Sequence, residues 1–325
     1  MRKSTKNYQS PNPLLWRGRN DGIRFHKVVN FIDFNKGDRT PQKGISLIGF
    51  AVDIGIKRNN GNLGASKGPD VIRQKLATLA YHGSQPIYDQ GNIVAEGDDL
   101  ETAQEKLKEV IRNNPVLAIV IGGGHELAWP QYKGLSEKYK KPIAVVNIDA
   151  HFDIRPLDKG KATSGTSFNQ IEAYCRENKL PFNYFVYGIQ EESNTDISFS
   201  KAKDIGVELI TAEKIHMNSE ETTRGLMNFV KKYEYVYLSV CMDAFSEVFA
   251  PGVSARSPLG LFPWQVLSVI GVIANSGRVV GLGVAEFSPN RDSNDITANL
   301  TSNLLSHFIR NYRQKRRLAF SHKNT

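Results

Sequence analysis

Short apolar runs rich in β-branched residues alternate with helix-length segments along the chain, and this alternation constrains the fold most strongly. The runs are continuously apolar, as expected of strands that helices cover on both faces. This order predicts an α/β fold, a three-layer sandwich with a mostly parallel central sheet. The expected strands are 45–52, 116–123, 143–150, 184–189, 207–211, 235–243 and 279–287, and the expected helices are 100–114, 126–140, 168–179, 220–232 and 262–276.

The chain is expected to form a single domain over residues 1–325, because it shows no internal repeat and no linker rich in Pro, Gly or Ser. A Gly-rich loop over 56–67 leads into a helix that should begin at Gly68-Pro69. This loop matches neither common phosphate-binding motif, so the sequence gives little support to nucleotide binding.

The formal charge of +9 is concentrated at the two ends of the chain. Residues 1–20 hold five basic side chains and 310–325 hold six, and neither segment holds an acidic one. Removing these eleven from the 42 basic residues leaves 31 against 33 acidic residues. We therefore expect basic flexible tails at about 1–12 and 313–325, and no nucleic-acid partner.

No apolar run approaches the ~18 residues that a membrane span needs, and the polar N-terminus lacks a secretory signal. We expect a cytoplasmic protein with no membrane partner. The two cysteines, Cys175 and Cys241, provide no disulfide framework.

Asp149, His151 and Asp153 follow a predicted strand at alternate positions. If the chain stays extended past Ile148, all three side chains leave the strand on one side. Neighbouring carboxylates repel one another unless a proton or a cation neutralises them, and imidazole mixed with carboxylate suits Mn, Fe, Zn or Co. A metal site is one interpretation; the other is that both acids cap a turn beside a loop histidine.

Three further strand ends carry similar groups: His125 after a triple glycine, Cys241 and Asp243 after an apolar strand, and Glu286 after another. Ligands of open α/β sheets bind beyond the carboxyl ends of the strands. Taken singly, each residue could also be a helix-terminal or surface residue. Four such groups, all at strand ends, favour a common metal site over four separate caps.

The segments "GGGHE" (122–126), "NIDAHFDIR" (147–155) and "SVCMDAFSEVFAPGVSA" (239–255) resemble the three signature motifs of the ureohydrolase, or arginase, family. The resemblance covers nearly the whole chain. It is closest to the formimidoylglutamase branch, through "WRGRNDG" (16–22), "LIGFAVDIGIKRNNGNLGASKGPDVIR" (47–73), "YDQGNIVAEGDDLETAQEKL" (88–107) and "SGTSF" (164–168).

The resemblance implies an arginase-like fold and two Mn²⁺ ions per subunit. It also implies that a metal-activated hydroxide attacks the amidine carbon of N-formimidoyl-L-glutamate, giving L-glutamate and formamide. By the same resemblance, Glu286 would pair with the cationic amidinium, and the protein would be a homo-oligomer. One ion would be held by His125, Asp149, Asp153 and Cys241, and the other by Asp149, His151, Cys241 and Asp243.

The two carboxylates of this substrate require cations or hydrogen-bond donors. Arg155 can grip a carboxylate with two hydrogen bonds, although a surface salt bridge is an equally good interpretation. Ser164 and Thr166 are suited to hydrogen-bond the substrate, or are simply turn residues.

Two departures from the family pattern keep other functions open. Cys241 stands where the wider family has the carboxylate expected to bridge both ions, so the second ion could be weakly held or the protein catalytically impaired. Ser164 stands where arginase and agmatinase carry a histidine, which disfavours the alternative of an agmatinase or guanidino-acid hydrolase.

Overall fold

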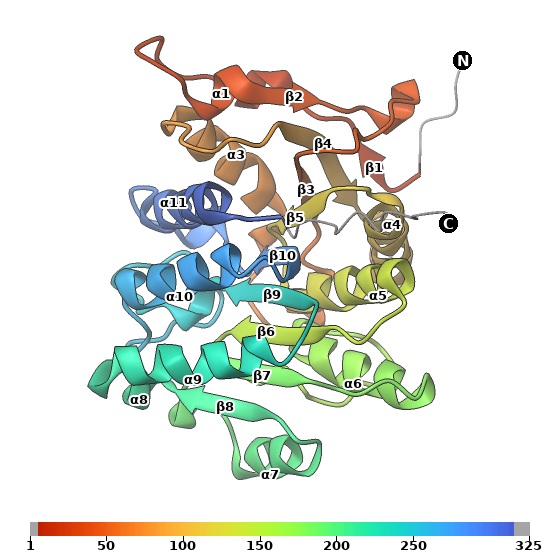
Figure 1. Cartoon of the computed structure of the whole chain (residues 1–325). Helices are drawn as coiled ribbons and strands as arrows, with labels where there is room; N and C mark the ends of the chain where they lie inside the picture. The colour runs from red at the N-terminus through yellow and green to blue at the C-terminus, as the bar shows by residue number, and fades with distance from the viewer. Residues whose placement is uncertain (1–5, 315–325) are drawn as a thin grey trace, which may run out of the picture.

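The computed structural model describes residues 6–314, and its centre is a ten-stranded sheet. The strand order is β1-β4-β3-β5-β10-β9-β6-β7-β8, with β2 paired to β4 (Figure 1). Among the strand pairs of residues 6–314, only β1–β4 is antiparallel, so the mostly parallel α/β sheet is confirmed. The strands are β1 Tyr8–Gln9, β2 Val29–Phe31, β3 Ile45–Ala51, β4 Ile87–Val94, β5 Leu117–Ile121, β6 Ala144–Ile148, β7 Tyr184–Ile189, β8 Glu208–Thr211, β9 Val236–Cys241 and β10 Val279–Ala285.

Helices cover both faces of the sheet (Figure 1). Side chains from α3, α9, α10 and α11 form one apolar core, and those from α4, α5 and α6 form the other. Ile119 of β5 belongs to the first core and its neighbour Val120 to the second, which is why the strands are continuously apolar. The helices are α1 Phe25–Val28, α2 Ile54–Arg58, α3 Gly68–Thr78, α4 Leu100–Asn113, α5 Ala128–Tyr139, α6 Ser167–Glu177, α7 Asp196–Asp204, α8 Ala212–Met217, α9 Ser219–Lys231, α10 Pro263–Asn275 and α11 Ile296–Asn311.

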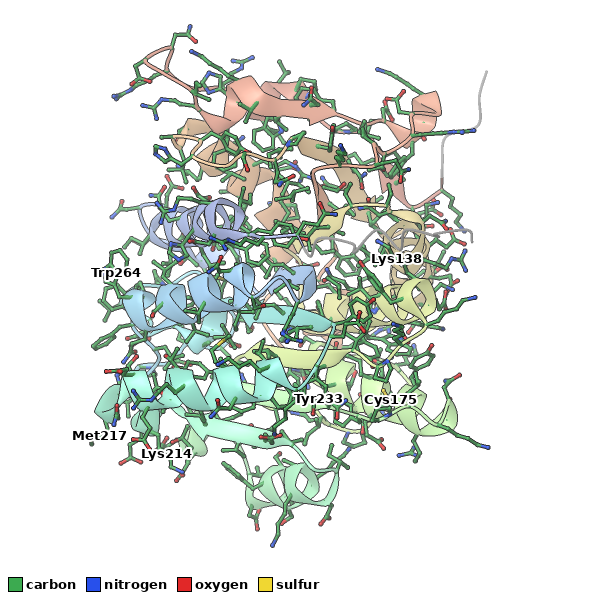
Figure 2. The ribbon with its side chains drawn as sticks, viewed as in Figure 1. Lys138, Cys175, Lys214, Met217, Tyr233 and Trp264 are labelled. Carbon is green, nitrogen blue, oxygen red and sulfur yellow. The ribbon has the colours of Figure 1, made fainter. Side chains whose placement is uncertain are left out.

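The two cysteines lie apart in this architecture. Cys175 is on α6 (Figure 2), where its sulfur lies 3.2 Å from the Tyr132 hydroxyl, and Cys241 ends β9. Both thiols are free and buried.

Strand β4 was not predicted, because polar residues interrupt it. Asp89 and Asn92 are buried there beside Arg73 of α3. The Arg73 guanidinium donates to both Asp89 oxygens at 2.8 and 2.9 Å, to Asn92 Oδ1 at 2.7 Å and to the Gly91 carbonyl at 2.8 Å. The Trp16 indole donates to Asp89 Oδ2 at 2.8 Å. We call these five residues the Arg73–Asp89 network.

The predicted N-terminal tail is shorter than expected. Asn7 and Tyr8 are buried, and β1 pairs with β4. The Asn7 amide group also donates to the Val94 carbonyl at 3.0 Å. Residues 7–9 are thus held against the sheet despite their polar composition, while 1–5 and 315–325 lie outside the described residues. Among residues 6–314, no helix combines the length and apolar character that a bilayer crossing requires.

Candidate metal centre

Four neighbouring strands, in the order β5-β10-β9-β6, deliver the predicted polar side chains to one edge of the sheet. The turn after β5 brings the backbone close to β3: a Cβ on Gly123, which has φ +76°, would lie 2.2 Å from the Phe50 carbonyl oxygen. Only glycine fits there. His125, two residues after Gly123, opens a short 3-10 helix, His125–Leu127.

The side chains that follow β5, β6 and β9 converge. His125 Nδ1 lies 3.1 Å from Asp149 Oδ2 and 2.9 Å from Asp153 Oδ2. His151 Nδ1 lies 3.3 Å from an Asp243 oxygen and 3.5 Å from Asp149 Oδ1. The predicted convergence is therefore present. We call the group the acid–imidazole cluster; it comprises His125, Asp149, His151, Asp153, Cys241 and Asp243.

Two overlapping sets of donor atoms in this cluster could each hold a metal ion. Single ligand atoms of His125, Asp149 and Cys241 all lie within 4.8 Å of one another, and so do those of Asp149, His151 and Asp243. Asp149 belongs to both sets. Nitrogen, oxygen and sulfur donors together suit a borderline divalent ion.

Unpartnered buried atoms support this interpretation. His125 Nδ1 makes no hydrogen bond despite its two close carboxylates, and Asp243 Oδ1 also has none. His125 Nε2 lies 2.8 Å from the Ser239 hydroxyl. If Nε2 donates its proton to Ser239, then Nδ1 carries a lone pair that faces carboxylate oxygens, which can only accept. A cation bound between Nδ1 and these oxygens would satisfy both.

Hydrogen bonds with neighbouring side-chain and backbone groups orient these ligands. Asp149 accepts hydrogen bonds from the Asn147 side chain at 2.9 Å and from the His151 backbone N–H at 2.8 Å. Glu286 Oε1 accepts the backbone N–H of His125 at 2.8 Å. Such second contacts fix ligand orientation before an ion binds.

Burial and neighbouring negative charges raise the pKa values of several acidic groups in and beside the cluster. Burial raises the pKa of Glu286 well above its ordinary value, and the charges of Glu126 and Asp243 add to this. Burial and the Asp149 charge likewise raise the pKa of Asp243, although His151 opposes them. Burial also raises the pKa of the Cys241 thiol. Cations bound among these groups would oppose every one of these shifts.

The chain does not stay extended past Ile148, so the condition for three side chains on one side of the strand is not met. It bends at Ala150 and His151, and Asp153 adopts a left-handed conformation with φ +49°. Glu286 is also left-handed, with φ +70°. The bend, rather than strand alternation, brings the Asp153 carboxylate toward His125, and backbone strain of this kind often marks a functional site.

The predicted substrate contacts have different outcomes. Thr166 is buried, and its hydroxyl accepts from the Thr163 N–H and donates to the Thr163 carbonyl within the same turn. Ser164 is buried and accepts a hydrogen bond from Asn59. Arg155 is exposed and donates to Asn59 Oδ1 at 3.1 Å. Among residues 6–314 no carboxylate forms a salt bridge with Arg155, so the surface-pair alternative is not observed.

Sequence reasoning assigned no role to two residues of this region. Glu126 is fully buried; its Oε1 accepts the Gly55 N–H at 2.8 Å, Oε2 has no partner, and burial raises its pKa to about 7. Its place directly after His125 was a usable signal. Asn59, which contacts both Arg155 and Ser164, gave no signal in the sequence.

The cluster is open to solvent on one side. The side chains of His151 and Asp153 are 18% and 12% exposed, whereas those of His125 and Asp149 are each 1% exposed. A substrate would therefore approach past His151 and Asp153, on the side where Arg155 follows in the chain.

Comparisons with known proteins agree with this geometry. A profile of the arginase family matches residues 43–310. Formimidoylglutamase from Legionella pneumophila (strain Paris) is 41% identical over 93% of this chain and 97% of its own, and that from Clostridium tetani is 38% identical over 91% and 94%.

Solved structures share the fold. Formimidoylglutamase from Bacillus subtilis superposes with a TM-score of 0.79 at 24% identity, over 90% of this chain and 93% of its own. Trypanosoma cruzi formiminoglutamase with Mn²⁺ gives 0.77 at 23% identity, over 83% and 94%. The arginase-like three-layer fold is confirmed, and the chain belongs to the arginase family.

Proposed function

We propose that this member of the arginase family hydrolyses N-formimidoyl-L-glutamate to L-glutamate and formamide. Relatives named for this activity match more than nine-tenths of the chain at 38 to 41% identity. The observation that carries the proposal is the acid–imidazole cluster, whose two overlapping donor sets share Asp149. Hydrolysis forms a bond from the amidine carbon to a water oxygen, breaks its bond to the glutamate nitrogen, and leaves that nitrogen with an added proton.

The cluster is proposed to hold two Mn²⁺ ions. When bound, such ions supply Lewis acidity and an activated water to a hydrolytic site. The unpartnered His125 Nδ1 and Asp243 Oδ1 support their fit. The proposed ligands are His125, Asp149, Asp153 and Cys241 for one ion and Asp149, His151, Cys241 and Asp243 for the other.

Two acids are proposed to act on the reacting group. Glu286 is buried beside the cluster, and its bond to the His125 N–H fixes its orientation, so its carboxylate can pair with the amidinium. Asp149, common to both donor sets, keeps the reacting centre in place through its own fixed contacts. Arg155 and Ser164 are proposed to bind a substrate carboxylate, and Thr166 supports their turn.

The experiment is a formamide-release assay on protein reconstituted with Mn²⁺, with formimidoylglutamate, arginine and agmatine compared side by side. We expect turnover of the first substrate only. Inertness toward all three would contradict the proposal, and turnover of agmatine would favour the alternative.

The same assay on Cys241→Asp tests the second candidate, a catalytically impaired relative, which the cysteine in a ligand position favours. An inactive wild type together with an active Cys241→Asp would establish that candidate. An active wild type would exclude it.

We further propose a cytoplasmic homo-oligomer that binds neither membranes nor nucleic acid. Met217, Leu259 and Trp264 are 80%, 69% and 78% exposed, and Met217 and Trp264 lie along the same side of the molecule (Figure 2). Met217, Leu259 and Phe262 line one surface pocket, and a grouped apolar surface supports self-association. Light scattering of the purified protein should give a mass above the 36.3 kDa of one chain, and a monomer would contradict the proposal.

A further inference from the structure

Asn59 joins two residues that the proposed function assigns to substrate binding. It follows α2, and its amide Oδ1 accepts from Arg155 Nη1 at 3.1 Å while Nδ2 donates to Ser164 Oγ at 3.1 Å. Arg155 and Ser164 come from one loop, where the Arg155 N–H also donates to the Gly165 carbonyl at 3.0 Å. Asn59 comes from a separate part of the chain, and its two hydrogen bonds bridge that part to the loop.

Chemistry fixes the orientation of this amide. A guanidinium has only donors, so the oxygen of Asn59 must face Arg155 and the NH₂ group must face Ser164. The Ser164 oxygen is then an acceptor toward Asn59, and its own hydrogen stays free to donate elsewhere. The other guanidinium N–H groups of Arg155 have no partner among residues 6–314. Both residues therefore present donors, as recognition of a carboxylate requires.

The segment that carries Asn59 is itself anchored. At the start of α2, Gly55 donates to the buried Glu126 beside the cluster. At its end, Arg58 Nη1 donates to the Ala162 carbonyl at 3.3 Å and pairs with Glu101 at 2.6 Å. The position of Asn59 is thus tied both to the loop that carries His125 and to the loop that carries Ser164.

We infer that Asn59 is a positioning residue for substrate recognition: it orients Arg155 and the Ser164 hydroxyl as a pair of donors for a carboxylate of the substrate. The inference rests on the proposed function and deepens it. A group that acts through others should affect substrate binding far more than the chemical step.

The test compares Asn59→Ala and Asn59→Asp with wild type in the formamide-release assay. Alanine removes both hydrogen bonds of the Asn59 side chain and should raise KM about tenfold, with kcat changed by less than about threefold. Aspartate still holds Arg155, but it accepts the Ser164 proton and adds a negative charge beside the incoming carboxylate. It should raise KM by about a further tenfold.

Asn62 provides a matched control, because it is exposed in the same loop and its side chain has no hydrogen bond among residues 6–314. Asn62→Ala and Asn62→Asp should keep the wild-type KM, and all four variants should keep the wild-type manganese content and unfolding midpoint. In the double variant Asn59→Ala/Arg155→Ala, the KM effects should be less than multiplicative, because Asn59 acts partly through Arg155.

Several outcomes would overturn the inference: an unchanged KM in both Asn59 variants, a fall in kcat alone, or an equal response of Asn62→Asp and Asn59→Asp. Its failure is distinguishable from failure of the proposed function. A wild type that releases no formamide contradicts the function, whereas an active wild type that is insensitive at Asn59 contradicts only the inference.

Discussion

The Arg73–Asp89 network and the acid–imidazole cluster are both buried groups of charged side chains, and they differ in how they are completed. In the first, the Arg73 guanidinium pairs with the buried Asp89 carboxylate at 2.8 Å and with the partly exposed Asp70 carboxylate at 3.7 Å, and hydrogen bonds from Trp16 and to Asn92 complete the network. In the second, acids outnumber imidazoles, and His125 Nδ1 and Asp243 Oδ1 have no hydrogen-bond partner.

This difference separates two uses of buried charge. A complete ion pair tolerates burial because each charge has its counter-charge and its hydrogen bonds within the chain. In the cluster, the chain itself does not supply every counter-charge and hydrogen bond, and a bound cation would supply the rest. The network should therefore govern stability under all conditions, and the cluster should do so only when metal is present.

Breaking the complete network should have the largest effect. Asp89→Ala removes the buried counter-charge of Arg73 and leaves only the partly exposed Asp70 carboxylate at 3.7 Å, so we expect the free energy of unfolding to fall by about 3 kcal/mol. Urea unfolding measures this. Glu220→Ala, which removes an exposed ion pair with Arg224, is the control and should leave the midpoint almost unchanged. A small loss for Asp89→Ala would show that the network is not the stabilising element.

Metal should stabilise the protein through the cluster. At Mn²⁺ about 100-fold above its Kd, wild type should gain about 2.7 kcal/mol per bound ion over protein in chelator, and Asp243→Asn should lose the gain from the ion that Asp243 holds. Without metal, Asp243→Asn should be at least as stable as wild type, because it removes an acid whose pKa burial and Asp149 raise. Urea unfolding with and without Mn²⁺ measures these differences. A wild-type stability that does not depend on Mn²⁺ would mean that the acid–imidazole cluster behaves like the Arg73–Asp89 network.

Cys241 should set the metal preference of the cluster. Cys241→Asp replaces a soft donor with a hard one, so the affinity for Mn²⁺ relative to Zn²⁺ should rise about tenfold, or about 1.4 kcal/mol. Competition dialysis measures this ratio.

A spectroscopic control identifies the ligand directly. Co²⁺-loaded wild type should show near-ultraviolet absorption from a thiolate bound to cobalt. Cys241→Ser should lose this absorption and Cys175→Ser should keep it, because Cys175 contacts Tyr132 on α5. Retention in Cys241→Ser would mean that the thiol is not a ligand.

Removing a single hydrogen bond from the Arg73–Asp89 network should have the smallest effect on stability. Trp16→Phe removes one hydrogen bond to Asp89, which keeps its bonds from Arg73, so we expect a loss of about 1 kcal/mol. The loss should be the same with and without Mn²⁺. A metal-dependent loss would show that the two clusters are coupled.

The same contrast explains what the sequence could predict. Strands such as β6 and β9 were predictable, because apolar residues toward both cores leave a local signal. Strand β4 was not, since its buried Asp89 and Asn92 resemble loop residues until their distant partner Arg73 is known. Identifying a polar strand of this kind requires the tertiary contact itself.

For the candidate site, residue types at strand ends were enough to predict which side chains meet. They did not predict the bend at Ala150 and His151, or the left-handed Asp153, since both depend on how the loop packs. Asn59 was missed for a related reason: an amide has no distinctive neighbours in sequence when its partners lie in other loops. Glu126 differs, because its place directly after His125 was a usable signal.

Asp153 and Glu286 carry functional carboxylates on left-handed backbone, a conformation that glycine adopts at lower cost. A glycine at either position would relieve both conformational strain and electrostatic repulsion. Lineages freed from selection for catalysis should therefore drift toward sturdier but inert proteins, and surveys of natural variation should find these two positions among the first to change.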